Sequence, residues 1–477
     1  MEPLPGQTVL VVGLGKSGQA ACAFLRRRGC RVRATDQATS PALATLAQGW
    51  VRERIPVELG GHTEQFCEGS RLVVVSPGVP QTAVPLRWAA RRGVPVIGEL
   101  ELGARFCRGR IVAVSGSNGK STVSTLIGTM FAAAERPVVV AGNIGTPLTE
   151  QLPQIRLGTT VVLEVSSFQL EQVERFRPSV ACLLNVTPNH LDRHVQWEQY
   201  VAAKRRLLTQ QRPMDWAVLN ADDPVCHTLR ASVRGRLLEF STQHPVRGAY
   251  LDGGDLVMVL RGRRHCVMTL DDLRLPGRHN VANVLAAIVV GGLLGVEPEV
   301  MAEAIQRFAG LPHRLEAVAT WQGMTFINDS KSTTVEAGLR ALEACPGRAV
   351  LIVGGKDKGS DFTRLRELTA QKARAAVLIG VDGLRLAQAL TGVVPTSSAA
   401  TMAQAVQRAA SLAQPGDWIL LSPMCTSFDM FHDFEERGEA FRAAVQALVA
   451  LEGQPLAAAF ARGNETTRPV GAAGAAA

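Results

Sequence analysis

Short runs of apolar residues, each followed by a turn of Gly, Ser, Asn or charged residues, recur along most of the chain. Such runs are typical of buried strands, and the longer segments between them have the apolar spacing of helices. We predict strands at residues 8–12, 31–35, 71–75, 111–114, 137–140, 160–165, 181–186, 324–328, 349–353, 376–379 and 418–421. Regular alternation of strands and helices predicts doubly wound α/β domains.

Two segments depart from this alternation, and a third ends it. Residues 246–270 alternate weakly in polarity and predict a β-rich insertion. Residues 284–296 form the longest apolar run, which is too short to span a bilayer. We predict that this run belongs to a buried helix that begins near residue 277. From Gly453 the chain becomes rich in Ala and Gly, which predicts a disordered tail.

The length of 477 residues suggests roughly three domains. We place the first at residues 1–102, the second at 103–311 and the third at 312–453, with the tail at 454–477. A polar, helix-like segment near residues 99–110 marks the first junction. The Leu-Pro-His-Arg sequence at 311–314 marks the second.

Composition narrows the class of protein. The chain is 19% charged and 46% hydrophobic, as expected of a folded soluble protein. Its net charge is +9 and its pI near 9.4, but the basic residues are scattered and aromatic residues make up only 5%. Acidic small-molecule substrates explain this balance, so we expect no nucleic-acid partner.

The nine cysteines are dispersed and form no CxxC pair. Such a set indicates reduced thiols in a cytosolic protein. No signal peptide opens the sequence, so we expect a cytoplasmic location.

The sequence IVAVSGSNGKSTVSTLI at residues 111–127 has the order strand, glycine turn, lysine, hydroxyl, helix. This is the arrangement of a phosphate-binding loop. Gly116 and Gly119 would let backbone N–H groups turn towards a polyphosphate. Lys120 would reach its outer oxygens, and Ser121 or Thr122 would hold Mg²⁺.

The match to the phosphate-loop pattern is incomplete. A strict pattern has glycine where this chain has Val114, so the loop is the shorter GxxGKS form. An ordinary strand–turn–helix connection is the alternative.

A second glycine motif, GLGKSG at Gly13–Gly18, follows the first predicted strand, and Asp36 ends the second. This spacing is typical of a dinucleotide-binding unit in which the acid binds a ribose hydroxyl. The motif alone indicates NAD, but it specifies only a pyrophosphate and a diol, which a UDP-sugar also offers. Ser76–Gly78 forms a further turn at the carboxyl end of this sheet. A Rossmann-like domain without a ligand is the structural alternative.

Polar residues also follow the strands of the second domain. Glu164 lies near the end of a buried strand, one strand from the phosphate loop, where it could bind the nucleotide's Mg²⁺. His190 and Asp192 follow the next strand, at the usual location of site residues. Since a buried charge needs a partner, a functional interpretation of Glu164 is favoured.

Two helical features are less specific. Lys204 lies among basic residues, and by pattern alone we predict a solvated helix lysine. Asn280 and Asn283 share a helix face, where they could meet a base or substrate, or cap the helix.

The third domain carries polar turns after its strands. These turns are rich in Gly, Ser, Lys and Asp, and they lie at residues 329–334, 354–359 and 422–429. They predict a third doubly wound domain.

Taken together, the motifs resemble those of the Mur ligase family. The resemblance covers residues 13–451 and is carried by GSNGKST (116–122), EVSSFQLE (164–171), NVTPNHLDRH (185–194), GRHNVAN (277–283), LPHR (311–314), NDSKST (328–333), GGKDKG (354–359) and LSPMCTSFDMFHDFEERG (421–438). It implies a Rossmann-like UDP-binding domain, a central P-loop ATPase-like domain with a mainly parallel sheet, and a Rossmann-like C-terminal domain.

The last motif, together with the GLGKSG opening, resembles the family member that adds D-glutamate. The implied activity is ATP-dependent amide synthesis on UDP-N-acetylmuramoyl-L-alanine through an acyl phosphate, in peptidoglycan precursor synthesis. The implied cofactors are ATP and Mg²⁺, and a monomer is expected.

Carried over to matching positions, the resemblance implies five groups of site residues. The catalytic group is Lys120, Glu164, His190 and Lys204, and the metal ligands are Ser121, Glu164, His190 and Lys204 if carbamylated. The ATP contacts are Gly116, Ser117, Asn118, Gly119, Lys120, Ser121, Thr122, Asn280, Asn283, Arg314 and Asp329. The UDP-substrate contacts are Ser17, Asp36, Ser76, Gly78 and Asn143. The D-glutamate contacts are Lys331, Thr333, Lys358, Ser427, Phe428 and Phe434.

The resemblance implies that Lys204 is carbamylated, which converts its cation into an anion that can lie near a metal ion. This reverses the prediction that Lys204 is a solvated helix lysine. Asn189, Thr334 and Lys16 depart from the family pattern. Three alternatives stay open: another Mur or folylpolyglutamate-type ligase, an NAD-dependent dehydrogenase suggested by residues 13–36, and a non-enzymatic nucleotide-binding module.

Overall fold

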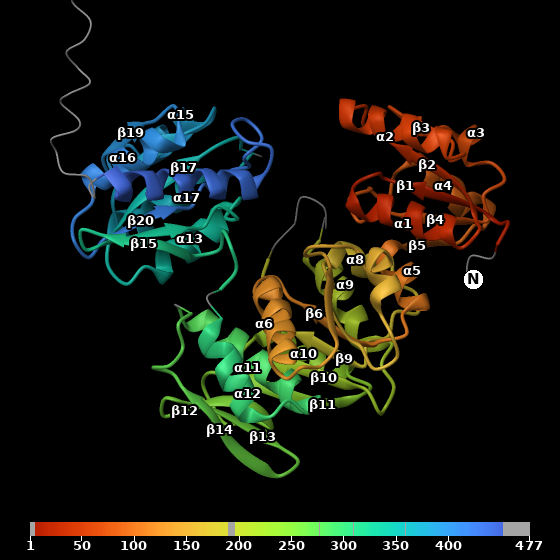
Figure 1. The fold of residues 1–477 in the computed structure, drawn as a ribbon, viewed down its shortest axis with the longest axis horizontal. Coiled ribbons are helices and arrows are strands. Elements are labelled where there is room, and N and C mark those ends of the chain that lie inside the picture. The colour runs from red at the N-terminus through yellow and green to blue at the C-terminus, as the bar shows by residue number, and fades with distance from the viewer. Residues whose placement is uncertain (1–4, 189–195, 276, 309, 358, 452–477) are drawn as a thin grey trace, which may run out of the picture. The chain divides into compact units, whose positions relative to one another are not determined.

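The computed structural model describes residues 5–188, 196–275, 277–308, 310–357 and 359–451. The chain divides into two compact units, Met1–Phe308 and Ala309–Ala477. Within the described ranges, no helix has both the length and the apolar character needed to cross a membrane. Three sheets, one after another along the chain, organise the fold (Figure 1).

The first sheet has five parallel strands in the order β3-β2-β1-β4-β5. Its strands are β1 (Thr8–Val12), β2 (Arg31–Asp36), β3 (Val57–Leu59), β4 (Leu72–Val75) and β5 (Val96–Gly98). Its helices are α1 (Lys16–Arg27), α2 (Pro41–Arg52), α3 (Glu64–Cys67), α4 (Val84–Arg92) and α5 (Glu99–Phe106). Alternate residues of β1 enter different cores, with Val9 and Val11 in one and Leu10 and Val12 in the other. Burial of both faces explains why the strand is continuously apolar.

The second sheet has nine strands in the order β14-β13-β12-β11-β10-β9-β6-β8-β7. Its strands are β6 (Arg110–Ser115), β7 (Val138–Gly142), β8 (Thr160–Glu164), β9 (Val180–Leu183), β10 (Trp216–Asn220), β11 (Arg236–Ser241), β12 (Gly248–Asp252), β13 (Asp255–Leu260) and β14 (Arg263–Thr269). The pairings from β7 to β12 are parallel, and those of β13 with β12 and β14 are antiparallel. From β6 the chain turns to one side for β7 and β8 and continues on the other with β9. This reversal places a topological switch point, the usual ligand position in open α/β sheets, at the carboxyl end of β6.

Helices cover this sheet and connect its strands. They are α6 (Lys120–Ala133), α7 (Leu148–Gln151), the 3₁₀ helix η1 (Leu152–Gln154), α8 (Ser167–Glu171), α9 (Trp197–Thr209), α10 (Pro224–Leu229), the 3₁₀ helix η2 (Arg230–Ser232), α11 (Arg278–Leu293) and α12 (Pro298–Arg307). Residues Val284–Val290 of α11 are fully buried, so the longest apolar run of the sequence is a core helix. The predicted β-rich insertion is confirmed as β12, β13 and β14.

The second unit contains a six-stranded sheet in the order β15-β16-β20-β17-β18-β19, parallel except for the β15–β16 pair. Its strands are β15 (Glu316–Trp321), β16 (Met324–Asn328), β17 (Ala349–Gly354), β18 (Ala373–Ile379), β19 (Thr396–Ser398) and β20 (Trp418–Leu421). Its helices are α13 (Val335–Ala344), the 3₁₀ helix η3 (Phe362–Leu365), α14 (Arg366–Lys372), α15 (Gly383–Leu390), α16 (Met402–Leu412) and α17 (Phe434–Leu451).

The α/β class and the three mainly parallel sheets confirm the fold predicted from the sequence. The domain boundaries after residues 102 and 311 stay predictions. The predicted disordered tail lies outside the described residues. Helix α1 begins at Lys16, because Gly15 is extended and ends the turn there.

Candidate functional site

The phosphate loop joins β6 to α6 at the switch point of the nine-stranded sheet. Gly119, the residue before the helix, has a φ of 81°, and a Cβ there would lie 2.2 Å from Oδ1 of Asn283. Only glycine tolerates both the backbone conformation and this approach. Nζ of Lys120 donates to the carbonyl oxygens of Gly116 and Ser117 at 2.9 and 3.0 Å. The lysine therefore lies over the loop it belongs to.

Three residues outside the loop hold it in place. Oδ1 of Asn185 accepts from the backbone N–H of Asn118 at 2.9 Å, and its Nδ2 donates to the carbonyl of the same residue at 3.2 Å. Oγ of Ser117 bonds with the Tyr200 hydroxyl at 2.8 Å and accepts from the Thr187 N–H at 2.9 Å. Asn185, Thr187 and Tyr200 are absent from the predicted site. The position of the first two just after β9 was a usable signal, whereas Tyr200 had none.

Glu164 ends β8, which pairs with β6, and its side chain is buried. Its Oε1 accepts from Nδ2 of Asn143 at 2.8 Å. Its Oε2 is buried and has no hydrogen-bond partner among the described residues. A buried carboxylate oxygen without a partner is unfavourable unless a cation binds it. This observation fits a metal ligand.

Lys204 is only 1% exposed, so the pattern-based prediction of a solvated lysine is wrong. It shares the inner face of α9 with Tyr200, Ala203 and Leu207, at helical spacing. Its Nζ lies 3.5 Å from Oγ of Ser115 and 4.8 Å from the centre of the Tyr200 ring. Burial, and then the charge of Lys120, hold the pKa of the Lys204 ammonium well below its ordinary range. The structure thus favours the neutral amine.

Asn280 and Asn283 lie on the first turns of α11, where both are buried. Nδ2 of Asn283 donates to Oδ1 of Asn280 at 3.1 Å. Because Asn283 also touches Gly119, the asparagine pair packs directly against the phosphate loop. Ser121 and Thr122 lie in the first turn of α6, directly after Lys120, and both are buried.

The predicted UDP-substrate residues fall in two places. Asp36 receives N–H groups from Leu14 at 2.6 Å and Ala38 at 2.9 Å, which ties it to the glycine loop that also carries Ser17. Oγ of Ser76 donates to the Gly13 carbonyl at 2.7 Å. Gly78 is exposed in the same turn as Ser76. Asn143 instead follows β7 and contacts Glu164.

A cavity of about 490 Å³ adjoins the glycine loop. It lies between α1, α2 and residues 145–150, with Lys16 and Trp50 among its lining residues. This volume is in the range of small-molecule sites.

In the second unit, the turn after β16 carries Asp329 and Lys331. Asp329 accepts from the Leu315 N–H and the Ser422 hydroxyl, both at 3.2 Å. Burial raises the pKa of its carboxyl to about 7, although Arg314 acts in the opposite direction. Nζ of Lys331 lies 5.3 Å from the centre of the Phe434 ring.

The other predicted D-glutamate residues follow β20. Lys356 and Thr426 form an isolated antiparallel bridge, which brings the turn after β17 beside Ser427. Ser427 is buried, Thr333 is partly buried, and Phe428 is 69% exposed. His190 and Lys358 lie outside the described residues, as does Asp192.

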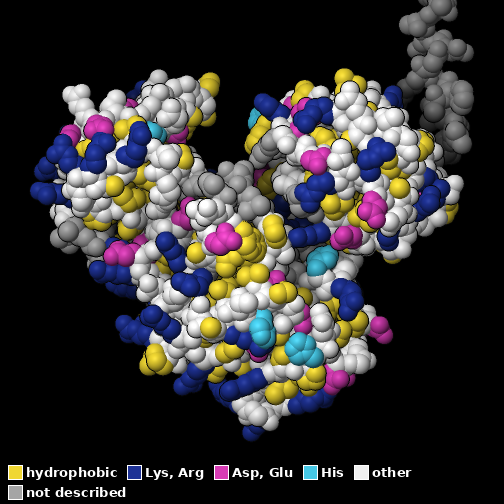
Figure 2. All heavy atoms as spheres, turned by 180° about the vertical axis from the view of Figure 1, so that it is seen from behind, with side chains coloured by type: hydrophobic (Ala, Val, Ile, Leu, Met, Phe, Trp, Pro, Cys, Tyr) yellow, Lys and Arg dark blue, Asp and Glu magenta, His cyan; other side chains and the backbone are white. Residues whose placement is uncertain are grey.

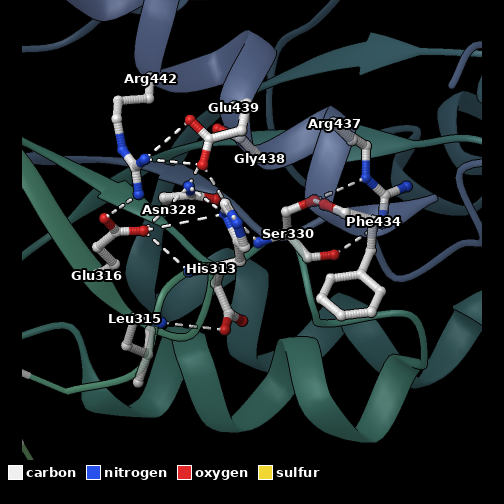
Figure 3. A network of polar contacts seen from close by, with 11 residues as sticks. His313, Leu315, Glu316, Asn328, Ser330, Phe434, Arg437, Gly438, Glu439 and Arg442 are labelled. Carbon is white, nitrogen blue, oxygen red and sulfur yellow. Dashed lines mark hydrogen bonds and ion pairs between the residues drawn. The ribbon is translucent and has the colours of Figure 1, made fainter. Parts of the chain in front are cut away.

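A buried arginine joins the turn after β16 to the turn after β20, and Figure 3 shows its contact with Ser330. Arg437 of α17 donates to Oγ and the carbonyl of Ser330 at 3.0 and 2.7 Å, and to the Cys425 carbonyl at 3.1 Å. Burial lowers its pKa to about 10. Arg437 is absent from the predicted site, because its partner Ser330 lies 107 residues away along the chain.

A second polar cluster in Figure 3 surrounds His313, which precedes Arg314. Nδ1 of His313 lies 3.0 Å from Nδ2 of Asn328, and its backbone N–H donates to Glu316 at 2.8 Å. A Cβ at position 438 would lie 2.1 Å from Nδ1 of His313, so Gly438 allows α17 to approach the ring. The cluster anchors the start of the second unit to α17.

On the face shown in Figure 2, Lys and Arg side chains are dispersed among other residues. All nine cysteines are free thiols, and eight of them are at least partly buried.

The fold and site define a class of protein: a nucleotide-binding α/β protein with three sheets and a phosphate loop at the switch point of the central one. Comparison with known domains gives the family. The Mur ligase MurD-like N-terminal domain matches residues 7–98, the Mur ligase middle domain matches 114–291, and the glutamate ligase domain of Mur ligases matches 313–425. The chain belongs to the Mur ligase family.

Related proteins are similar in sequence to this chain over nearly its full length. UDP-N-acetylmuramoylalanine–D-glutamate ligase of Acidobacterium capsulatum is 43% identical over 92% of this chain and 96% of its own. The protein of the same name from Solibacter usitatus is 44% identical over 93% and 99%.

Solved structures support the fold. The UDP-N-acetylmuramate-alanine ligase MurC of Thermotoga maritima has a TM-score of 0.59 at 17% identity, covering 92% of this chain and 99% of its own. The MurF ligase of the same organism, in complex with ADP, has a TM-score of 0.56 at 15% identity, covering 94% and 96%.

Proposed function

We propose that this chain is an ATP-dependent ligase that joins D-glutamate to UDP-N-acetylmuramoyl-L-alanine in peptidoglycan precursor synthesis. The observation that carries the proposal is the full-length similarity to ligases of that name, at 43% and 44% identity. The match to the MurD-like N-terminal domain supports a UDP-sugar, rather than NAD, as the ligand of the first glycine motif. The dehydrogenase and the non-enzymatic module are therefore disfavoured.

The chemistry proceeds in two balanced steps. A carboxylate oxygen of the UDP-substrate attacks the γ-phosphorus of ATP, so that an acyl phosphate forms and ADP leaves. The amine of D-glutamate then attacks the acyl carbon, the amide forms, and phosphate leaves with the bonding electrons. Two anions must approach in the first step, so the site requires fixed positive charge where the phosphoryl group is transferred.

The phosphate loop supplies the first of these charges. Lys120 lies over Gly116 and Ser117 and is the residue we assign to the γ-phosphate. We assign the chain of phosphates to the backbone N–H groups at the start of α6. Asn280 and Asn283 pack against the loop and are assigned to the nucleotide, with Arg314 and Asp329 of the second unit as further contacts.

The residues present fit Mg²⁺. Oε2 of Glu164 is a hard oxygen ligand, is buried and has no hydrogen-bond partner among the described residues. Ser121 follows Lys120 in the first turn of α6 and offers a hydroxyl. We assign both to the metal, with His190 as a further candidate outside the described residues. When bound, Mg²⁺ neutralises phosphate charge and polarises the phosphoryl oxygens.

Lys204 is the candidate for carbamylation. Only a neutral amine can add to CO₂, and burial beside Lys120 favours this form. The product is an anion, which removes the repulsion between two neighbouring lysines and would compensate the Lys120 charge. We propose this modification as the role of Lys204.

The D-glutamate site is assigned to the second unit. Lys331, Thr333, Ser427 and Phe434 offer a cation, two hydroxyls and a ring, as binding of a dicarboxylate requires. Phe428 and the undescribed Lys358 belong to the same proposal. The UDP-substrate is assigned to Ser17, Asp36, Ser76, Gly78 and Asn143.

Since all nine thiols are free and ATP is a cytoplasmic substrate, we propose that the reaction takes place in the cytoplasm. A monomer is the expected active form.

Phosphate release tests the proposed function. The chain is supplied with ATP, Mg²⁺ and UDP-N-acetylmuramoyl-L-alanine, and amino acids are added one at a time. We expect release to depend on D-glutamate. Release that depends on another amino acid would identify a different Mur or folylpolyglutamate-type ligase, and no dependence on any amino acid would refute the assignment.

A further inference from the structure

Helix α5 connects the first two sheets and belongs to the cores of both. Leu102 lies in the core of the five-stranded sheet, whereas Leu100 lies in the core of the nine-stranded sheet. At its end, the ring of Phe106 packs 5.2 Å from that of Phe24 in α1. An eight-residue helix with buried contacts on both sides forms a rigid joint rather than a linker.

Two glutamates of this helix are buried, and they are not among the residues assigned to the reaction. Glu101 has no solvent exposure. Its carboxylate accepts backbone N–H groups of Glu174, Arg175 and Phe176 at 2.9–3.1 Å, and Nε of Arg105 at 2.7 Å. Both oxygens are therefore fully used, and the segment after α8 is bound to α5 through its backbone.

Glu99 is the first residue of the same helix and is 2% exposed. Its Oε1 accepts both the backbone N–H and the hydroxyl of Thr149, each at 2.7 Å. Its Oε2 is buried with no hydrogen-bond partner in the described part of the chain. Burial raises the pKa of the Glu99 carboxyl, which favours its neutral form.

The segments held by these carboxylates flank Glu164 on both sides. Residues 174–176 follow α8, which comes directly after β8 and Glu164. Thr149 belongs to α7, which follows the turn that carries Asn143, and Asn143 donates to Glu164. The N–H of Gly98 also donates to the Gln172 carbonyl at 3.1 Å, immediately before α5.

We propose that Glu101 is a positioning residue that holds the UDP-substrate cradle of the five-stranded sheet at a fixed distance from Asn143 and Glu164. The proposal rests on the proposed function. A substrate that contacts both sheets binds tightly only if the cradle and the residues around Asn143 already lie at the right distance, and this preorganisation contributes to its affinity. Helix α5, held by Glu101, sets this distance before the substrate binds.

The same isosteric substitution at both positions tests this proposal. In E101Q, one amide oxygen replaces two carboxylate oxygens that serve four donors, so buried N–H groups lose their acceptor. We expect the KM for UDP-N-acetylmuramoyl-L-alanine to rise about tenfold or more because the cradle shifts. The KM for ATP should stay within about twofold, since the loop contacts are intact.

E99Q is the matched control two residues away. Its amide oxygen keeps both bonds from Thr149, and its NH₂ replaces the oxygen that has no partner. Because the Glu99 carboxyl already favours its neutral form, we expect all kinetic constants to stay within about twofold of the unsubstituted chain. Calorimetric titration with UDP-N-acetylmuramoyl-L-alanine should show weaker binding in E101Q only.

A purely structural role predicts a different result. Partial unfolding lowers the active fraction, which reduces kcat and leaves each KM unchanged. That result, or an equal rise in the KM for ATP, or equal effects of E101Q and E99Q, would overturn the proposal. If E101Q does not fold, R105K keeps the charge but loses the guanidinium fork that bridges Glu101 and Glu174, and an unchanged substrate KM in folded R105K overturns it. Failure of the proposed function can be told apart from failure of the positioning role. In that case the unsubstituted chain shows no D-glutamate-dependent phosphate release.

Discussion

At the scale of single residues, the site depends on charges in unfavourable surroundings. Lys204 is buried beside another lysine, Glu164 has an oxygen without a partner, and Asp329 is buried with only partial compensation. Each of these side chains makes the folded chain less stable than an apolar residue would. Their placement is explained if ligands or a modification complete the interactions.

For Lys204 we predict chemical rescue. K204A should lower turnover by about a hundredfold or more, because the site loses a preorganised anion. A small carboxylic acid such as formate should restore part of the activity by occupying the vacated space. The control is R205A, which removes an exposed cation from the next position of α9 and should neither lose activity nor respond to formate. Lack of rescue at any formate concentration would count against the carbamate.

Gly119 should not tolerate a side chain. G119A combines a φ of 81° with a Cβ that would lie 2.2 Å from Asn283 Oδ1, so the loop must move. We expect ATP affinity to fall about tenfold or more. G93A is the matched control, because Gly93 has a φ of 65° but no atom within 4 Å of its Cβ position. Equal ATP affinities of the two variants would show that the contact with Asn283 is unimportant.

Asp329 should make stability depend on pH. Its pKa is raised from 3.8 to about 7, so between these values the folded chain holds a proton that the unfolded chain has released. Stability should therefore fall as pH rises through this window, by up to about 1.4 kcal/mol per pH unit. D329N mimics the protonated acid and should lack this component. A difference in melting temperature between the two chains that does not change with pH would contradict this account.

At the scale of elements, helices carry side chains that contact the phosphate loop in the first unit and the turns after β16 and β20 in the second. Helix α9 presents Tyr200 to the phosphate loop and Lys204 to β6. Helix α17 presents Arg437 to the turns that carry Lys331 and Ser427. Tyr200 and Arg437 thus act on the site by holding other residues, whereas Lys204 is itself a candidate metal ligand once it is carbamylated.

For α17 we predict a selective effect on D-glutamate. R437K keeps the charge but cannot make three directed contacts to Ser330 and Cys425, so the KM for D-glutamate should rise about tenfold. The KM for ATP should change less than that for D-glutamate, because most of the residues assigned to ATP lie in the other unit. R442K, the same change on the same helix at a partly exposed ion pair with Glu316, should leave the KM for D-glutamate within about twofold. If both substitutions raise it equally, Arg437 has no special role.

Much of the secondary structure could be predicted from the sequence. Strands β1, β16 and β20 have the bounds expected from their apolar runs, because glycines, polar turns and prolines end those runs sharply. The burial of Lys204 could not be predicted, since its basic neighbours hid its position on the apolar face of α9. Arg437 was missed because it bonds to Ser330, 107 residues away, and periodicity carries no information about such pairs.

At the scale of the whole molecule, the proposed function assigns residues to both units. The phosphate loop, Glu164 and Lys204 lie in the first unit, and the residues assigned to D-glutamate lie in the second. Within the first unit, α5 ties two sheets together through buried carboxylates. A substrate that spans both sheets explains why this helix has so little freedom.

The most direct test of the central claim follows the oxygen atoms. UDP-N-acetylmuramoyl-L-alanine is prepared with a heavy isotope of oxygen in its terminal carboxylate and incubated with the chain, ATP, Mg²⁺ and D-glutamate. An acyl phosphate intermediate predicts that each released phosphate carries one labelled oxygen, and only when D-glutamate is converted to amide. Unlabelled phosphate, or labelled phosphate formed equally well with L-glutamate, would contradict the account.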